Sequence, residues 1–260
     1  MKNRLSKLDE IRGYTLISMI LYHFMWDLKY LAGFKMDWYV GIIGTVWQQS
    51  ICISFILISG FSFSLGKKHF KRSMTVFLAG VIVSVVTLLF MPENRIVFGI
   101  LTFMGSAGLL MIPINKLHSE LEKKLDAKTL NITMIIWSFL LFIVFYNVNE
   151  GYINVLLKQI RIGKYMYDGY VMTYLGFTDP MFYSTDYFSI IPWIFMYLCG
   201  FYLYRITCVG KSTDYKQYLV REHSKQIAFI GRNTLIIYML HQPVLYLITL
   251  LIQHFILFHI

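Results

Sequence analysis

The stretch that decides the fold reads Leu8-Asp9-Glu10-Ile11-Arg12-Gly13 and leads directly into an apolar window, Tyr14–Leu31, that carries His23 and Asp27. Ionisable groups are rare in bilayer-spanning helices, because each costs about 2.5–3.5 kcal/mol at the helix centre. Arg12 and His23 are eleven residues apart. That spacing is close to three helical turns, so the two side chains share one helix face and lie about 16 Å apart along it. The window therefore predicts one polar group at the membrane interface and another inside the membrane.

The composition is that of a polytopic membrane protein. Of the 260 residues, 57% are hydrophobic and 15% are charged, whereas roughly a quarter are charged in a soluble domain. Besides the first window, six more are long enough to cross a hydrocarbon core of about 30 Å: residues 44–65, 73–91, 97–114, 131–148, 187–204 and 234–255. We expect an all-α membrane protein, with a bundle of about seven transmembrane helices in one integral-membrane domain over residues 1–260.

The basic residues predict the orientation of this bundle. Only six of the 24 Lys and Arg residues fall in segments predicted to lie outside, namely Lys29, Lys35, Arg95, Lys158, Arg161 and Lys164. The bias places the N-terminus in the cytoplasm and the C-terminus outside. Topology and contact with anionic membrane lipids explain this charge, and attraction of a nucleotide-bearing cofactor is the alternative. The basic residues lie in short loops without a folded platform, so no nucleic-acid partner is expected.

The first helix carries the strongest chemical pattern. Asp27 lies one turn beyond His23, where a carboxylate can orient an imidazole and support it as a general base. A buried pair that only locks the helix to its neighbours is the alternative. Arg12 suits phosphate binding through its planar guanidinium, and anchoring at the lipid headgroups would explain it equally well. No spacing of cysteine residues indicates a zinc site, and we expect no metal.

A second polar stretch begins just before the last apolar window and continues into it. Arg232 and Asn233 are predicted at the inner interface, and His241 lies about two turns further, before Pro243. A proline in this place frees a backbone carbonyl and suits the wall of a cavity, so His241 is a candidate lining residue. A hydrogen bond within its own helix is the alternative. On the outer side, Asp186 is a further candidate, with helix capping as its alternative.

Several of these motifs carry a resemblance to a known family. They are Leu8–Gly13, Tyr22–Leu28, Leu57–Ser62, Val97–Leu101, Asp186–Phe188 with Ile191–Trp193, and Gly231–Asn233 through His241–Pro243. In this order, along nearly the whole chain, they resemble the heparan-α-glucosaminide N-acetyltransferase-like bacterial proteins of the transmembrane acyltransferase superfamily. The motif Gly99-Ile100-Leu101-Thr102 departs from them, because bacterial relatives commonly have histidine where this chain has Thr102. The small residues from Ser59 to Gly66 predict close helix packing.

The resemblance implies a function. It implies transfer of an acyl group, usually acetyl, from cytoplasmic acyl-CoA to an acceptor on the far side of the membrane, with the reacting centre around His23 and Asp27. It places the phosphates of acetyl-CoA near the inner polar residues, for which Arg12, Arg232 and Asn233 are the candidates. Thr102, Asp186 and His241 are the candidates for the cavity. A cell-envelope glycan or a lipid-linked precursor in a bacterial plasma membrane is the expected acceptor.

Two other functions fit the same residues. One is a proton-coupled transporter of a small molecule or lipid-linked sugar, in which His23, Asp27 and His241 would relay protons; the absence of an inverted repeat in the sequence argues against it. The other is a catalytically silent relative that binds CoA, which the departure at Thr102 keeps open. The sequence identifies neither the acceptor nor the oligomeric state.

Overall fold

The computed structural model describes residues 5–156, 158–208, 220 and 223–259. Contacts divide the chain into two compact units. The terminal unit comprises residues 1–55 and 210–260, and the central unit comprises residues 56–209. The division falls inside the helix α3 (Ile42–Phe63). The single integral-membrane domain expected from the sequence stays a prediction.

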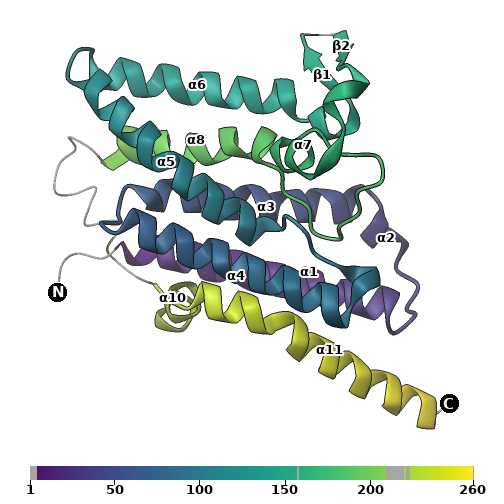
Figure 1. Cartoon of the computed structure of the whole chain (residues 1–260). Helices are drawn as coiled ribbons and strands as arrows, with labels where there is room; N and C mark the ends of the chain where they lie inside the picture. The colour runs from purple at the N-terminus through teal and green to yellow at the C-terminus, as the bar shows by residue number, and fades with distance from the viewer. Residues whose placement is uncertain (1–4, 157, 209–219, 221–222, 260) are drawn as a thin grey trace. The chain divides into compact units, whose positions relative to one another are not determined.

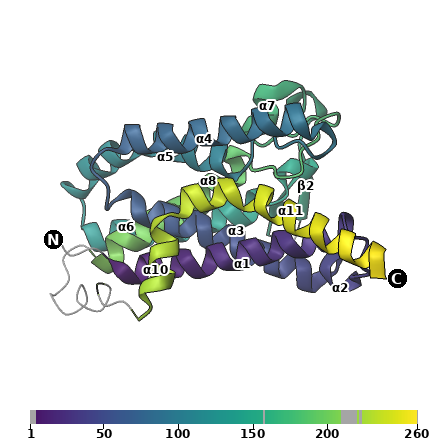
Figure 2. The same ribbon diagram turned by 90° about the horizontal axis from the view of Figure 1, so that it is seen from below.

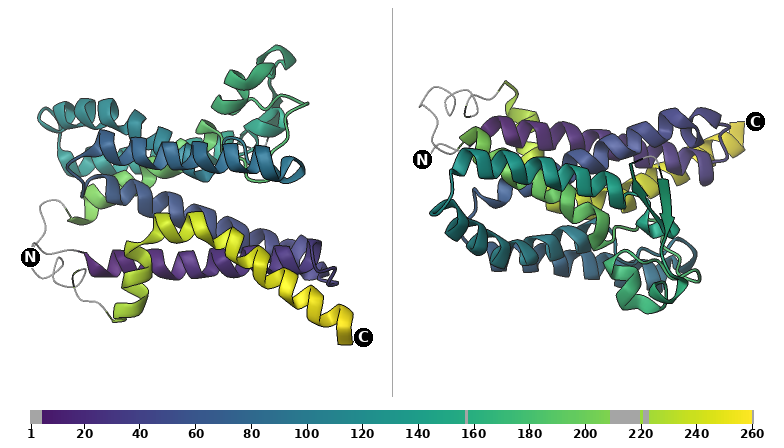
Figure 3. Two further views of the ribbon diagram at one scale, coloured as in Figure 1. Left: turned by 60° about the horizontal axis from the view of Figure 1, so that its bottom comes forward. Right: turned by 90° about the horizontal axis from the view of Figure 1, so that it is seen from above.

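The terminal unit is built on the first and last helices of the chain. Figure 1 labels its elements, which are α1 (Ser6–Tyr30), the short α2 (Asp37–Val40), the first part of α3, α10 (Lys225–Arg232) and α11 (Thr234–His259). Helix α11 runs alongside α1, and α10 crosses the first turns of α1 (Figure 2). The same arrangement of the purple and yellow helices is seen in the left view of Figure 3.

The joint between α1 and α10 depends on the motif that opens the chain. Glu10 is buried, and its Oε1 accepts hydrogen bonds from the backbone N–H groups of His223, at 2.5 Å, and Ser224. Both donors lie directly before α10. The first backbone N–H groups at the start of a helix have no partner within the helix. The Ser224 hydroxyl caps the same end by accepting from the N–H of Ile227. An acidic residue on α1 therefore fixes where α10 begins.

The central unit holds the remaining long helices. These are α4 (His69–Phe90), α5 (Ile100–Glu122), α6 (Ala127–Phe145) and α8 (Ile190–Cys208). Helix α4 packs on α5, and α6 packs on α8. Glycines permit these close approaches: a Cβ on Gly80 would lie 2.5 Å from the backbone nitrogen of Thr102, and one on Gly60 would lie 2.0 Å from the carbonyl oxygen of Tyr197. Within the stretch Ser59–Gly66, close helix packing is thus observed at Gly60.

The segment between α6 and α8 contains the only strands among the described residues. Strands β1 (Tyr152–Val155) and β2 (Lys158–Arg161) form an antiparallel hairpin. The same segment contains η2 (Val148–Glu150), η3 (Lys164–Met166) and α7 (Gly169–Leu175), whereas η1 (Pro92–Asn94) lies between α4 and α5. The hairpin and α7 lie at the same end of the central unit (Figure 1; Figure 3, right). Elsewhere the described residues are mostly helical, as expected.

Each of the seven predicted windows is a helix, and six helices in the described part of the chain are long and apolar enough to cross a membrane. They are α3, α4, α5, α8, residues 127–150 and α11 as far as Phe255. Helix α1 has 25 residues, about 37 Å of helix, but carries the charged motif described above. The seventh span and the N-inside orientation stay predictions. Five basic residues predicted to be cytoplasmic lie outside the described residues, namely Lys2, Arg4, Lys211, Lys216 and Arg221.

Candidate functional site

Four polar side chains of α1 and α11 meet inside the terminal unit. His23 and Asp27 are contributed by α1, and His241 and Gln242 by α11. The imidazole rings of His23 and His241 have centroids 5.0 Å apart. The amide Nε2 of Gln242 donates a hydrogen bond of 2.8 Å to Oδ1 of Asp27, which is fully buried. The structure therefore brings His23, Asp27 and His241 together, and adds Gln242.

Three buried polar atoms of this cluster have no hydrogen-bond partner among the described residues. They are Oδ2 of Asp27, Nε2 of His241 and Oε1 of Gln242. A buried polar atom without a partner costs about 1–3 kcal/mol. Native proteins keep such atoms mainly where water or a ligand satisfies them. The cluster therefore has the unsatisfied polar capacity of a binding site.

The tautomer of His241 follows from its surroundings. Its Nδ1 contacts the backbone carbonyl oxygen of Tyr238. A carbonyl only accepts hydrogen bonds, so Nδ1 carries the proton. In the neutral ring, the unpartnered Nε2 then has the free electron pair of a base. The helix-bonding role considered for His241 is therefore present, and it leaves the other ring nitrogen available for chemistry.

The carboxylate of Asp27 has a different partner from the one expected. Its hydrogen bond in the described structure is from Gln242, whereas the sequence suggested support of His23 by Asp27. Gln242 belongs to the motif His241-Gln242-Pro243 but was not among the predicted site residues. An amide beside a histidine on an apolar helix was the available signal, but its partner could be found only by placing α11 on α1. The catalytic roles of His23 and Asp27 stay predictions.

The three residues predicted to bind the donor lie near the joint of α1 and α10. Nη1 of Arg12 is 2.9 Å from Oδ1 of the buried Asp9. Arg232 is exposed at the end of α10, and the amide of Asn233 donates 2.9 Å to the carbonyl oxygen of Phe229. Arg12 is thus engaged within its own helix, and Arg232 is the more accessible cation. Their binding role stays a prediction.

Thr102 and Asp186 belong to the central unit. Thr102 is buried in the contact between α5 and α4, and its hydroxyl would lie 2.6 Å from a Cβ on Gly80. Oδ2 of Asp186 accepts a hydrogen bond of 3.1 Å from the backbone N–H of Ile100, at the start of α5. The capping alternative for Asp186 is therefore the geometry observed, while a cavity role for either residue stays a prediction.

The capping carboxylate makes stability depend on pH. Loss of hydration raises the pKa of the half-buried Asp186 to about 6, against the opposing hydrogen bond from Ile100. A folded-state pKa above the unfolded value means that stability falls as pH rises through about 4 to 6. Asp186→Asn keeps the acceptor oxygen and removes the charge. We expect the Tm difference, variant minus wild type, to increase between pH 4 and pH 6.5. A constant difference across that range would contradict the raised pKa.

Metal chemistry has no evident site in the described residues. No group of three or more His, Cys, Asp or Glu side chains there could hold a metal ion. The chemistry of the α1–α11 cluster is that of two imidazoles, a carboxylate and an amide. The imidazoles and the carboxylate can accept and transfer protons, and the amide can orient them by hydrogen bonding.

The fold and this cluster define a multi-pass helical membrane protein with a buried polar site between its first and last helices. Residues 4–243 match the family model described as heparan-alpha-glucosaminide N-acetyltransferase, catalytic. The match covers most of the chain, so this protein belongs to that family, as the sequence motifs suggested. No curated protein and no solved structure matches the chain.

Proposed function

We propose that this protein is an integral-membrane acyltransferase that moves an acetyl group from cytoplasmic acetyl-CoA to an extracytoplasmic acceptor. A cell-envelope glycan or its lipid-linked precursor, in a bacterial plasma membrane, is the acceptor we propose. The family supports acetyl transfer, since its model describes an N-acetyltransferase catalytic domain. The observation that carries the proposal is the buried cluster of His23, Asp27, His241 and Gln242 with its three unpartnered atoms.

The cluster suits the proton transfers of acetyl transfer. The acceptor hydroxyl or amine attacks the thioester carbonyl carbon while an imidazole nitrogen takes its proton. We assign this step to His23. The ring of His241 lies 5.0 Å away between ring centroids and has an unpartnered Nε2, so His241 is the second base. The tetrahedral intermediate then collapses, the carbon–sulfur bond breaks, and the imidazolium returns the proton to the CoA thiolate. Two neighbouring imidazoles avoid being charged together, so one proton serves both steps.

Asp27 and Gln242 support this mechanism because of where they lie relative to His23. The carboxylate lies one turn from His23 and favours a transient positive charge on the imidazole ring. Gln242 holds that carboxylate through the 2.8 Å hydrogen bond, and its own buried Oε1 has no partner among the described residues. The tetrahedral oxyanion needs hydrogen-bond donors, for which Asn233 is the candidate within the terminal unit.

Acetyl-CoA binding is the direct test of this proposal. We expect calorimetry on the purified full chain in detergent to show binding that weakens about tenfold in Arg232→Gln, the magnitude of one hydrogen bond to a charged group. Arg232 is preferred to Arg12 for this test, because removing Arg12 would leave the buried Asp9 without its ion pair. Lys35→Gln removes an exposed charge on the predicted outer side and is the matched control.

Two results would contradict the proposal. The first is an absence of acetyl-CoA binding by wild-type protein that unfolds cooperatively, which would favour the transporter. The second is an equal loss of affinity in the Lys35→Gln control, which would show attraction by net charge alone. Binding without transfer to any acceptor, including glucosamine as a probe amine, would identify a catalytically silent relative.

A further inference from the structure

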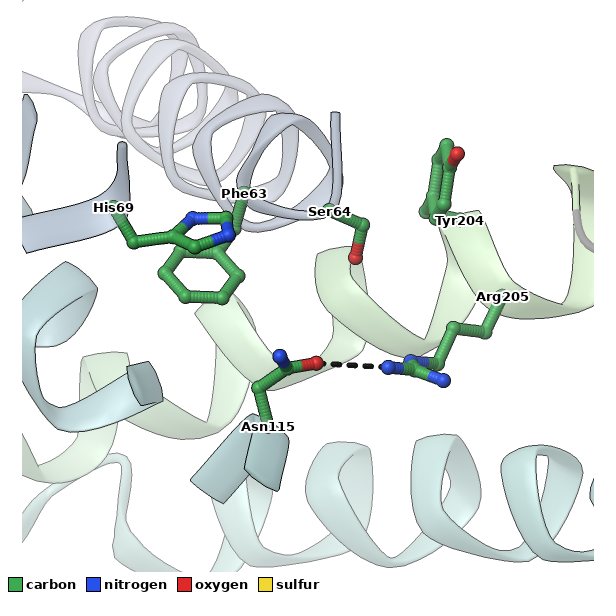
Figure 4. Close-up of a pocket in the computed structure, with 6 residues that line it drawn as sticks. All are labelled: Phe63, Ser64, His69, Asn115, Tyr204 and Arg205. Atoms are coloured by element: carbon green, nitrogen blue, oxygen red, sulfur yellow. Dashed lines mark hydrogen bonds between the residues drawn. The ribbon is translucent and has the colours of Figure 1, made fainter. Parts of the chain in front are cut away.

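The central unit has a polar pocket whose lining includes none of the residues assigned to the proposed reaction. Its volume is about 200 Å³, and its lining comprises Phe63, Ser64, His69, Asn115, Tyr204 and Arg205. These residues are contributed by the ends of α3 and α8, the start of α4 and the last third of α5 (Figure 4). Sites for drug-sized ligands usually measure about 300–1,000 Å³. This pocket is therefore sized for one small polar group.

The lining presents hydrogen-bond donors and no carboxylate. Nε of Arg205 and the hydroxyl of Ser64 are buried and have no partner among the described residues. In Figure 4, Ser64, Asn115 and Arg205 point toward the same space. Oδ1 of Asn115 accepts a 2.8 Å hydrogen bond from Nη2 of Arg205, so its amide N–H₂ group is left to face the pocket. A group that accepts several hydrogen bonds would satisfy these donors.

Arg205 is held rigidly for such a role. Its Nη1 forms an ion pair with Glu122, and its guanidinium lies over the ring of Phe201, 4.9 Å from the centroid. Glu122 is fixed in turn by Asn131, whose Nδ2 donates 2.8 Å to its Oε1. All five guanidinium N–H bonds lie in one plane. With both Nη atoms engaged, the orientation of the Nε–H bond is set before a ligand binds.

The surroundings of the pocket favour an anion. Glu122 neutralises much of the Arg205 charge. The attraction for an anion therefore comes from four exposed cations just before and in the first turn of α4, which are Lys67, Lys68, Lys71 and Arg72. Helix α4 begins at His69, and its first amides add a partial positive charge. The His69 ring stacks on Phe63 with 4.2 Å between centroids, which holds the imidazole at the pocket.

We propose that this pocket binds a phosphate group, with Arg205 Nε, Asn115 Nδ2 and the Ser64 hydroxyl as its donors. Phosphate offers several acceptor oxygens and full negative charge, and it fits a space this small. Two molecules near a cytoplasmic membrane surface carry such a group: the acyl donor and an anionic lipid headgroup. The site is independent of whether the chain transfers acetyl groups.

The test compares isosteric variants that differ only in charge. Ser64→Asp places a carboxylate among the donors, and Ser64→Asn is its neutral match. Asn115→Asp keeps the acceptor that Arg205 uses and adds a charge, so it provides a second variant if Ser64→Asp does not fold. The Tm of the purified full chain in neutral detergent is measured against inorganic phosphate, with chloride at matched ionic strength. Ligands that bind only the folded state raise Tm in a saturable way.

We expect phosphate to raise the Tm of wild type and Ser64→Asn. The aspartate variants should need at least tenfold more phosphate for half the shift. No shift in wild type, or an equal shift in both aspartate variants, would overturn the proposal, since phosphate would then bind only the exposed lysines or nothing.

Two further arms identify the source of the phosphate. If Asn115→Asp or Ser64→Asp weakens acetyl-CoA affinity, the acyl donor uses the pocket. If these variants instead lose stabilisation by phosphatidylglycerol relative to phosphatidylcholine nanodiscs, the ligand is a lipid headgroup. If the variants keep both their acetyl-CoA affinity and their stabilisation by phosphatidylglycerol, neither the acyl donor nor a lipid headgroup is the ligand, and both assignments are overturned. If wild type binds acetyl-CoA but phosphate does not raise its Tm, only the phosphate pocket is wrong. If phosphate raises Tm but acetyl-CoA does not bind, only the proposed function is wrong.

Discussion

Replacing His23 by alanine should lower acetyl transfer by about 10²–10⁴-fold, the usual contribution of a positioned general base. The second imidazole, His241, limits the loss, because its ring is 5.0 Å away between centroids and can take part of the proton transfer. The double variant His23→Ala with His241→Ala should therefore lose more than either single variant. The measurement is the release of CoA thiol in an acceptor assay in which wild type turns over.

The control for this prediction is His254→Ala, an exposed histidine further along α11. It should keep wild-type turnover. Full activity in His23→Ala would contradict the assignment of the base, and it would leave acetyl-CoA binding to decide whether the chain is an acyltransferase at all. Loss of activity together with a lower Tm would instead indicate that the histidine pair holds the helices together.

Replacing Gly231 by alanine should have the largest effect on stability. A Cβ at this position would lie 1.7 Å from the backbone carbonyl oxygen of Asp9 and 3.0 Å from the nitrogen of Gly13. Neither backbone atom can move without separating α10 from α1. Overpacking of a rigid contact costs about 3 kcal/mol, which lowers Tm by on the order of 10 °C in a chain of this size. Thermal unfolding of the purified protein measures it.

Gly41→Ala is the matched control, because Gly41 lies in the same unit, has φ of −88° and has no nearer neighbour than 3.6 Å. Its Tm should stay within about a degree of wild type. A Gly231→Ala protein as stable as this control would show that α10 is not packed on α1 as described.

Much of the fold could be predicted from the sequence, because apolar length and the position of charged residues are local properties. All seven windows are helical, and the shared face of Arg12 and His23 on α1 was readable from residue spacing. The sequence grouped His23, Asp27 and His241 only as the proton relay of the transporter alternative, and in the structure these residues lie close together. The family resemblance supplied the order of the motifs along the chain.

The remaining contacts could not be predicted, because they join residues far apart in the chain. Gln242 and Asp27 are 215 residues apart, and the capping of α10 by Glu10 spans 214 residues to Ser224. The acidic residues beside Arg12 were read as part of a motif, whereas they hold α10 and the Arg12 guanidinium. The phosphate pocket similarly needs Asn115 and Arg205, 90 residues apart, to be placed face to face.

The contact between α1 and α10 also determines where the two histidine rings lie along their helices. Two arms of ten residues lead from one contact to the other. The arm from Gly13 to His23 is about 15 Å of the helix α1, and the arm from Gly231 to His241 crosses the junction of α10 and α11 at Asn233. Adding or deleting one residue in either arm would turn its histidine by about 100° and move it by about 1.5 Å. The chain therefore tolerates changes of residue type along these arms far better than changes of length.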